Sequence, residues 1–215
     1  MNEMSNRLDP RERARADLYR LLSACYYQPE AAFLEEDVFG QLEEAAARVC
    51  PDLQSDAAAL GDGFRDTDLQ ELTLDYTRLF LGPFDIRAKP YGSIYLDGDG
   101  TVMGASTANV LALYREGGFE IADDIHEVPD HVALELEFAY LLSLALAEPA
   151  VAAEHARRRN LKRRFVEAHL GRWISRLADA MRAGAETDFY RRLADLTQRV
   201  VLQDRRELGQ RTGTA

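Results

Sequence analysis

The sequence predicts an all-α protein. Apolar residues recur at the i, i+3, i+4, i+7 spacing of a core-facing helix through most of the chain. Pro and Gly fall where those patterns stop, and helix-capping residues often stand where they start. The alternation of a half-buried strand is scarce, with only a turn-like segment at Asp97–Gly100. The expected architecture is therefore a helical bundle.

Four helices are predicted in the N-terminal part. The first ends before Pro29, and the second has acidic residues in its first turn and Pro51 just beyond its end. The third is weaker and rich in glycine. The fourth opens with Thr67-x-x-Gln70, which resembles a capping box, and stops at Gly82-Pro83. The expected ranges are 18–26, 33–50, 53–64 and 69–80.

Residues 83–105 lose the helical periodicity and combine Gly and Pro with aromatic side chains. A loop of this length inside a compact protein is usually functional or disordered. Its aromatic residues predict an ordered loop that packs on the core. Ser106 or Thr107 is expected to cap the next helix, which ends at Gly117-Gly118.

Residues 129–147 predict a central, largely buried helix, because apolar side chains surround most of its axis. Pro129 suits the first helical position, where its missing N–H would be unpaired anyway. Asp130 would complement the positive end of the helix dipole. This charged N-terminal end, which also carries His131, is the first place to look for function.

The C-terminal part opens with a basic run at residues 157–164. A solvated helix face or inter-helix turn is favoured over a phosphate or nucleic-acid site, because the chain as a whole is acidic. An amphipathic helix over 166–181 and a last helix capped by Thr187-Asp188 complete the expected fold.

Composition limits the function classes. The 215 residues are 47% hydrophobic and 29% charged, as in an ordinary globular protein, and carry a formal net charge of -11. That charge disfavours general binding to nucleic acid or anionic membranes and favours basic partners. The N-terminus lacks the apolar run of a signal peptide, no stretch is long enough to cross a bilayer, and Cys25 and Cys50 fit buried reduced thiols. A cytoplasmic protein is expected.

Catalytic and metal motifs are weak. His126, Asp130, His131 and Glu135 could contribute to a metal site, since residues four apart share a helix face. Helix-terminus hydrogen bonding is favoured over this arrangement, but a metal-dependent helical hydrolase stays open as the alternative. A plain structural subunit of a larger complex is a third. No phosphate-binding loop, calcium loop or nucleophile elbow is formed, so the chain is not expected to be an enzyme.

Several segments carry a resemblance by their order and spacing: Asp75–Pro83, Pro90–Leu96, Gly104–Thr107 with Tyr114 and Gly117–Phe119, Glu127–His131, and Glu135–Phe138. Taken together, they make the chain resemble the TorD/DmsD family of cytoplasmic chaperones for molybdenum-cofactor oxidoreductases over nearly its whole length. Ala105 departs from the Glu that relatives often carry. Trp173 is the only tryptophan, so peptide preference is expected to differ.

The resemblance implies a helical N-terminal part, residues 1–128 with the aromatic loop 83–105, and a smaller C-terminal part, residues 129–215. It also implies binding of the twin-arginine signal peptide, the apo body, or both, of a molybdopterin-containing catalytic subunit until the cofactor is inserted. Family members include monomers and domain-swapped dimers. No resident cofactor is expected, and weak binding of guanine nucleotide or molybdenum cofactor rests on resemblance alone.

The peptide site is expected at the charged helix end and the aromatic loop. Asp130, with Glu127 or Asp75, is expected to meet the two arginines, and His131 to orient the hinge and tune release near neutral pH. The full candidate set is Asp75, Tyr76, Leu79, Phe80, Pro90, Tyr91, Ser93, Tyr95, Glu127, Pro129, Asp130, His131 and Glu135.

Overall fold

The computed structural model describes residues 8–82, 86–98, 100–122, 125 and 127–210, and it confirms the all-α fold. Across those residues no strand is formed, apart from an isolated bridge between Tyr91 and His131. The helices are α1 (Pro10–Ala24), α2 (Ala32–Glu35), α3 (Val38–Val49), α4 (Gln54–Arg65), α5 (Leu69–Tyr76), α6 (Gly92–Leu96), α7 (Ala105–Gly117), α8 (Val132–Ala147), α9 (Ala152–Phe165), α10 (Gly171–Gly184) and α11 (Asp188–Gln210). A 3₁₀ turn at Pro51–Leu53 and π-helical turns at Thr77–Leu81 and Val166–Leu170 complete them.

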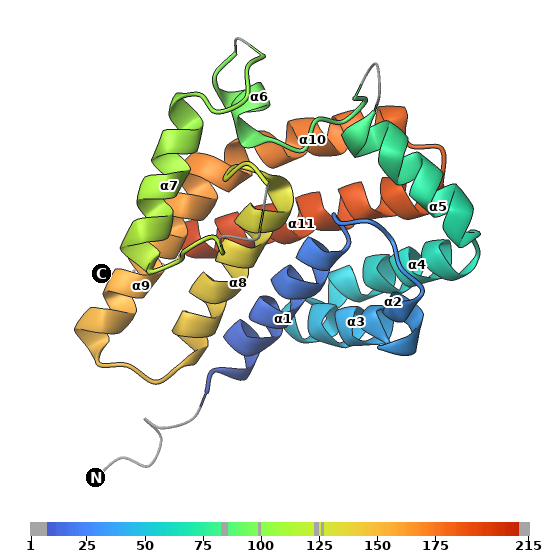
Figure 1. The fold of residues 1–215 in the computed structure, drawn as a ribbon. Helices are drawn as coiled ribbons and strands as arrows, with labels where there is room; N and C mark the ends of the chain where they lie inside the picture. The colour runs from blue at the N-terminus through green and yellow to red at the C-terminus, as the bar shows by residue number, and fades with distance from the viewer. Residues whose placement is uncertain (1–7, 83–85, 99, 123–124, 126, 211–215) are drawn as a thin grey trace.

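Two long helix pairs form the centre of the molecule. α1 lies antiparallel to α8, with the Asp9 N–H bonded to the Ala147 carbonyl at one end and the Ser23 hydroxyl bonded to the Ala133 carbonyl at the other. α11 packs against α10 and α4, and α3 joins α1 to α4 (Figure 1). α8 is apolar on nearly every side and almost wholly buried, as its sequence predicts.

The division at residues 128 and 129 stays a prediction. Helices from its two sides pack together: α1 on α8 and α4 on α11 (Figure 1). None of the helices in the described ranges is both long and apolar enough to cross a membrane.

Three details of the predicted helices are wrong: one start, one cap and one uninterrupted range. α8 begins at Val132 rather than Pro129, because Val128 to His131 forms a turn and His131 is the N-cap. α5 is capped by Asp68, whose carboxylate accepts the Gln70 N–H at 2.8 Å, while the hydroxyl of Thr67 donates back to the Gly63 carbonyl. Residues 33–50 split into α2 and α3, because Asp37 adopts a left-handed conformation, with φ of 50°, that interrupts the helix.

α7 has a cap from outside its own sequence. Its N-cap residue is Gly104, which has no side chain to offer. The carboxylate of Asp97, at the end of α6, accepts both the backbone N–H and the hydroxyl of Ser106. The predicted Ser106 therefore takes part as a donor, and the acceptor comes from the preceding loop.

The basic run at residues 157–164 lies on α9. Most of its arginines form surface ion pairs, for example Arg157 and Arg158 with Glu154 and Arg164 with Glu116. This confirms the solvated-face interpretation, with one exception. Lys162 is fully buried.

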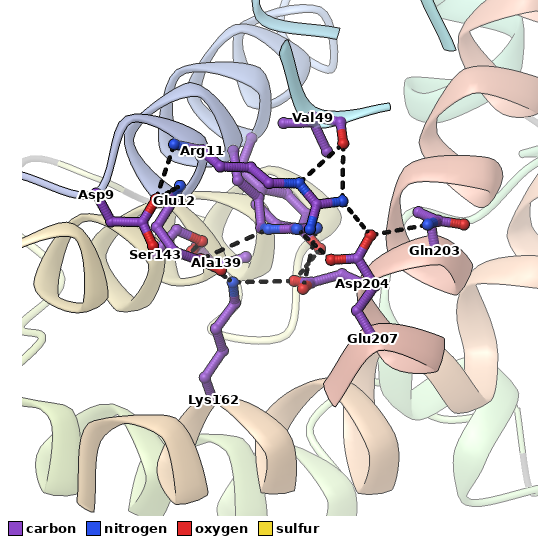
Figure 2. Close-up of polar contacts among 12 residues, drawn as sticks. Asp9, Arg11, Glu12, Val49, Ala139, Ser143, Lys162, Gln203, Asp204 and Glu207 are labelled. Carbon is purple, nitrogen blue, oxygen red and sulfur yellow. Dashed lines mark hydrogen bonds and ion pairs between the residues drawn. The ribbon is translucent and has the colours of Figure 1, made fainter. Parts of the chain in front are cut away.

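Lys162 belongs to a buried ionic network that joins α1, α9 and α11 (Figure 2). Its ammonium group lies 3.2 Å from Asp204 and 3.1 Å from Glu12. Arg15, 1% exposed, lies 3.2 Å from Asp204 and 2.7 Å from Glu207. The cations keep the pKa of Asp204 below its ordinary value in spite of burial, so the carboxylate is ionised. The network ties the first long helix to the last.

Candidate functional site

A short segment crosses the N-terminal end of α8. We call residues Pro90–Leu96 the strap. The Pro90 carbonyl accepts the Val132 N–H at 2.8 Å, and the Asp130 carbonyl accepts the Gly92 N–H at 2.9 Å, on either side of the Tyr91–His131 bridge. The first N–H groups of a helix have no acceptor within the helix. The Pro90 carbonyl is such an acceptor for the Val132 N–H, and it comes from outside α8.

Asp130 anchors the strap. Its Oδ2 accepts the Ser93 N–H at 2.6 Å, and the residue is fully buried. Its Oδ1 is buried without a hydrogen-bond partner, as is the Ser93 hydroxyl. Asp130 was expected to meet peptide arginines, but in this arrangement its carboxylate has no exposed surface for such a contact.

His131 caps α8 between two tyrosines. Its Nδ1 accepts the Ala133 N–H at 3.2 Å, and its ring lies 6.4 Å from that of Tyr27 and 5.5 Å from that of Tyr91. Burial lowers the pKa of His131 from 6.5 to about 4, with Asp130 opposing that shift. The imidazole is thus neutral at neutral pH, and the expected tuning of release near neutrality does not fit its surroundings.

Glu135 lies in the interior, one turn into α8. Its Oε1 is 2.8 Å from Nε2 of His169, and its Oε2 accepts the indole N–H of Trp173 at 3.1 Å. Burial raises the pKa of Glu135 above its ordinary value, while His169 and Trp173 act in the opposite direction. Although it was predicted as a peptide contact, it has no exposed surface.

Asp75 caps a distant helix. Its carboxylate accepts the N–H groups of Glu186 and Thr187 and the Thr187 hydroxyl, at the N-terminus of α11. The residue is 1% exposed, and its carboxylate is already occupied by these hydrogen bonds. It is therefore not available for the arginine contact that was expected.

The remaining candidates divide between core and surface. Leu79, Phe80 and Pro90 are buried, and Tyr76 is 9% exposed. Tyr95 stacks on Trp173 with ring centroids 5.7 Å apart, and Arg176 lies 5.9 Å from its centroid. Of the predicted set, Tyr91, Glu127 and Pro129 keep partly exposed side chains beside His131.

Two residues outside the predicted set complete this surface. Tyr27 follows α1 and stacks on His131, and its hydroxyl donates to Glu137 of α8 at 3.5 Å. The pKa of Tyr27 is raised by burial and by the nearby charges of Glu137 and Glu127. After burial, the charge of Glu127 also raises the pKa of Tyr76 and Tyr91, so the three tyrosines lie within the electrostatic reach of this carboxylate. We call Tyr27, Tyr76, Tyr91, Glu127 and Glu137 the tyrosine–carboxylate cluster.

The two carboxylates of this cluster differ from most other half-buried acids in the described part of the chain. Within the part of the chain that the structure describes, neither Glu127 nor Glu137 lies in a salt bridge, whereas most other half-buried acids do. Burial raises the pKa of Glu137, which reports the cost of holding its charge there. An arriving cation would relieve that cost.

An apolar hollow lies along α5, whose last residue, Tyr76, is part of the cluster. It measures about 600 Å³ and is lined by Asp68, Leu69, Gln70, Thr73, Leu74 and Thr77. Leu69 and Leu74 are 38% and 49% exposed, so an apolar chain segment could cover them.

The chain is similar in sequence to known proteins. The model of the nitrate reductase delta subunit family matches residues 40–179. The Tat proofreading chaperone DmsD of Salmonella typhimurium is 30% identical over 86% of this chain and 85% of that protein. The chaperone protein TorD of Shewanella loihica is 28% identical over 97% of this chain and all of its own length. The chain belongs to the TorD/DmsD family.

The fold agrees with that membership. A crystal structure from Archaeoglobus fulgidus, described as a redox enzyme maturation protein, superposes with a TM-score of 0.55 at 19% identity, covering 94% of this chain and 96% of its own. That similarity supports the TorD/DmsD-like helical fold.

TorD/DmsD membership leaves the metal-dependent hydrolase without support. His126 lies outside the described residues. The other three candidate ligands are directed at different partners: Asp130 at the strap, His131 at its own helix and Glu135 at His169 and Trp173. In the described residues no group of three His, Cys, Asp or Glu side chains could hold a metal ion.

Proposed function

We propose that this chain is a maturation chaperone that binds the twin-arginine leader of a molybdopterin-containing oxidoreductase. The observation that carries the proposal is the pair of unneutralised, half-buried carboxylates, Glu127 and Glu137, among three tyrosines. The relatives named TorD and DmsD are chaperones, and DmsD is named for Tat proofreading.

A guanidinium group fits such a cluster for two reasons. It forms charge-assisted, often bidentate hydrogen bonds with a carboxylate, and it stacks on aromatic faces. Tyr27 and Tyr91 both contact His131, which is neutral and therefore does not repel an arginine. Two carboxylates can receive two adjacent arginines.

The apolar hollow along α5 supports the second half of the recognition. A twin-arginine leader continues from its arginines into an apolar stretch. Thr73 and Thr77, which line the hollow, lie on α5 and its π-helical extension beside Tyr76, on a neighbouring face. We place the apolar stretch over Leu69 and Leu74.

In this proposal the buried candidates build the site and do not touch the leader. Asp130 and Ser93 hold the strap, His131 supports the two tyrosines, and Asp75 fixes the position of α5 against α11. Leu79 and Phe80 form the core beneath.

The remaining features of the proposal rest on the family resemblance. The protein acts in the cytoplasm, is not an enzyme, and contacts the apo body of its client as well as the leader. It has no resident cofactor, and any binding of guanine nucleotide or molybdenum cofactor is weak. It binds no nucleic acid, does not insert stably into membranes, and is a monomer or a domain-swapped dimer.

Isothermal titration calorimetry tests the leader proposal. The titrant is the leader peptide of a molybdoenzyme encoded beside this protein, with a matched peptide in which both arginines are alanine. We expect saturable binding to the first at about micromolar Kd and a loss of about tenfold or more for the second. Equal affinity for the two peptides would exclude recognition of the arginines.

A further inference from the structure

Glu135 is a buried carboxylate that arginine recognition, helix capping and the ionic network all leave unexplained. Glu135 of α8 is fully buried and receives two hydrogen bonds, from His169 in the π-helical turn and from Trp173 of α10. An apolar side chain would fill this position without the cost of desolvating a carboxylate. The side chain therefore has a task other than filling space.

The strap lies directly on this hydrogen-bonded group. A Cβ atom added to Gly92 would come within 3.1 Å of Oε1 of Glu135 and 3.2 Å of the Trp173 indole, so backbone and carboxylate are in close contact. Three residues further along the strap, Tyr95 lies nearly parallel to Trp173, with 13° between the ring planes. Trp173 is thus held by Glu135 on one side and supports Tyr95 on the other.

The other end of the strap forms part of the tyrosine–carboxylate cluster. Tyr91 contacts His131, and the next residue is Gly92. Displacement of Gly92 or Tyr95 would move Tyr91 with them, because only a few covalent bonds separate these residues.

We propose that Glu135 is a positioning residue for leader binding. By fixing Trp173 and His169, it sets the surface on which Gly92 and Tyr95 rest, and so holds Tyr91 in place for the leader arginine. This inference depends on the proposed function. It differs from the earlier expectation in that Glu135 acts through the strap and does not touch the peptide.

Trp173 makes the proposal measurable, because it is the only tryptophan in the chain. Its fluorescence and its quenching by acrylamide report directly on the Glu135 contact and on the strap that covers it. This signal reports on the strap in the absence of any peptide.

Two substitutions at one position separate positioning from mere packing. Glu135→Leu keeps a similar volume but removes both acceptor oxygens. Glu135→Gln keeps an oxygen for the Trp173 N–H, and its amide can donate to the unprotonated Nε2 of His169. Ser143→Ala is the matched control, since Ser143 is buried on α8 and donates only to the Ala139 carbonyl.

We expect Glu135→Leu to raise the leader Kd by about tenfold and to increase acrylamide quenching of Trp173, while Glu135→Gln and Ser143→Ala stay within about threefold of wild type. A folded Glu135→Leu variant with wild-type Kd and wild-type quenching would overturn the proposal. If that variant does not fold, Trp173→Phe decides by calorimetry, because it keeps an aromatic ring and deletes the N–H. An unchanged Kd for Trp173→Phe would also overturn it.

The experiment distinguishes the two proposals. If wild type fails to bind the leader, the proposed function is wrong, and the quenching difference between Glu135→Leu and Glu135→Gln still tests whether Glu135 holds the strap. If wild type binds and quenching is identical in all variants, the leader proposal stands and the positioning role is rejected.

Discussion

The carboxylate of Asp75 and the backbone of Thr187 form a helix cap between residues 112 positions apart in the chain. The Thr187 N–H donates to Asp75 Oδ2 at 2.8 Å, and the Thr187 hydroxyl donates to the same atom at 2.8 Å. An acidic residue beside a conspicuous tyrosine thus supports α11 from another helix.

Asp75→Ala is expected to reduce the free energy of unfolding by about 2 kcal/mol, because α11 loses its N-terminal acceptor and buried donors are left unpaired. Urea denaturation measures the loss. Leader affinity of the folded variant should change by less than about threefold, because Asp75 supports α5 and does not touch the leader. A rise of about tenfold in Kd at equal fold content would return Asp75 to the peptide site.

Glu127→Gln and Glu137→Gln are each expected to raise the leader Kd by about tenfold, because each removes a charge that would pair with a guanidinium in a partly buried setting. Calorimetry at low salt measures this, and affinity of wild type should fall as ionic strength rises. Glu36→Gln changes an exposed carboxylate at the C-terminal end of α2; it is the control and should bind as wild type. Wild-type affinity in both site variants would place the arginines elsewhere.

Tyr27→Leu is expected to weaken leader binding several-fold while the fold is retained, since leucine fills part of the space over His131 but offers no aromatic face to a guanidinium. Tyr27→Phe is the paired variant. It keeps the face and loses the hydroxyl that bonds to Glu137, so it should bind better than Tyr27→Leu. The reverse order would contradict a stacking role for this ring.

His131 predicts a dependence of stability on pH. Its pKa is 6.5 when exposed in the unfolded chain and about 4 in the folded protein. The unfolded state therefore binds the proton first, and the stabilisation is complete above pH 6.5 and is lost as the pH falls from 6.5 to 4. The difference corresponds to about 3 kcal/mol. Chemical denaturation of wild type and His131→Asn at pH 7 and pH 4 isolates this contribution. If the unfolding free energies of wild type and His131→Asn change equally between pH 7 and pH 4, the imidazole is not held neutral in the folded protein.

Breaking the buried ionic network should cost more stability than breaking an ion pair on the surface. Arg15→Met removes a cation that pairs with both Asp204 and Glu207, and we expect a loss of about 3–5 kcal/mol in unfolding free energy. Arg182→Met breaks only surface pairs with Asp179 and Asp195 and should cost no more than about 1 kcal/mol. Equal losses in the two variants would mean that burial adds nothing to the network.

The sequence predicts most of the long helices because they carry an apolar periodicity, and it predicts α8 because that segment is apolar on nearly every side. It misses α6, which lies in the segment 83–105 that was expected to be a loop, because that segment shows no helical periodicity. The starting residue of α8 is missed because the Pro90 carbonyl that meets Val132 lies 42 positions away, and Pro129 looks like an adequate first residue. Asp75, Asp130 and Glu135 are found as acids near aromatic residues, but their burial depends on long-range packing and cannot be read from local spacing.

Three residues whose roles the sequence analysis missed also depend on contacts between distant parts of the chain. Tyr27 follows the inward Tyr26 and gives no signal of its own until α1 is placed against α8. Lys162 lies within a basic run and looks solvated, because its partners Glu12 and Asp204 are 150 and 42 positions away. Glu137 is visible in the resemblance, but only its pairing with Tyr27 gives it a role.

The ionic network also bears on how the protein is made. Arg15 is synthesised long before its partners Asp204 and Glu207, and the second of these lies 192 positions further along the chain. Before Asp204 and Glu207 leave the ribosome, Glu12 would be the acidic partner of both Arg15 and Lys162. Docking of α1 against α9 at that stage would bury an uncompensated positive charge. The buried ionic network can therefore form completely only after Asp204 and Glu207 have left the ribosome, so the docking of α1 waits for α11.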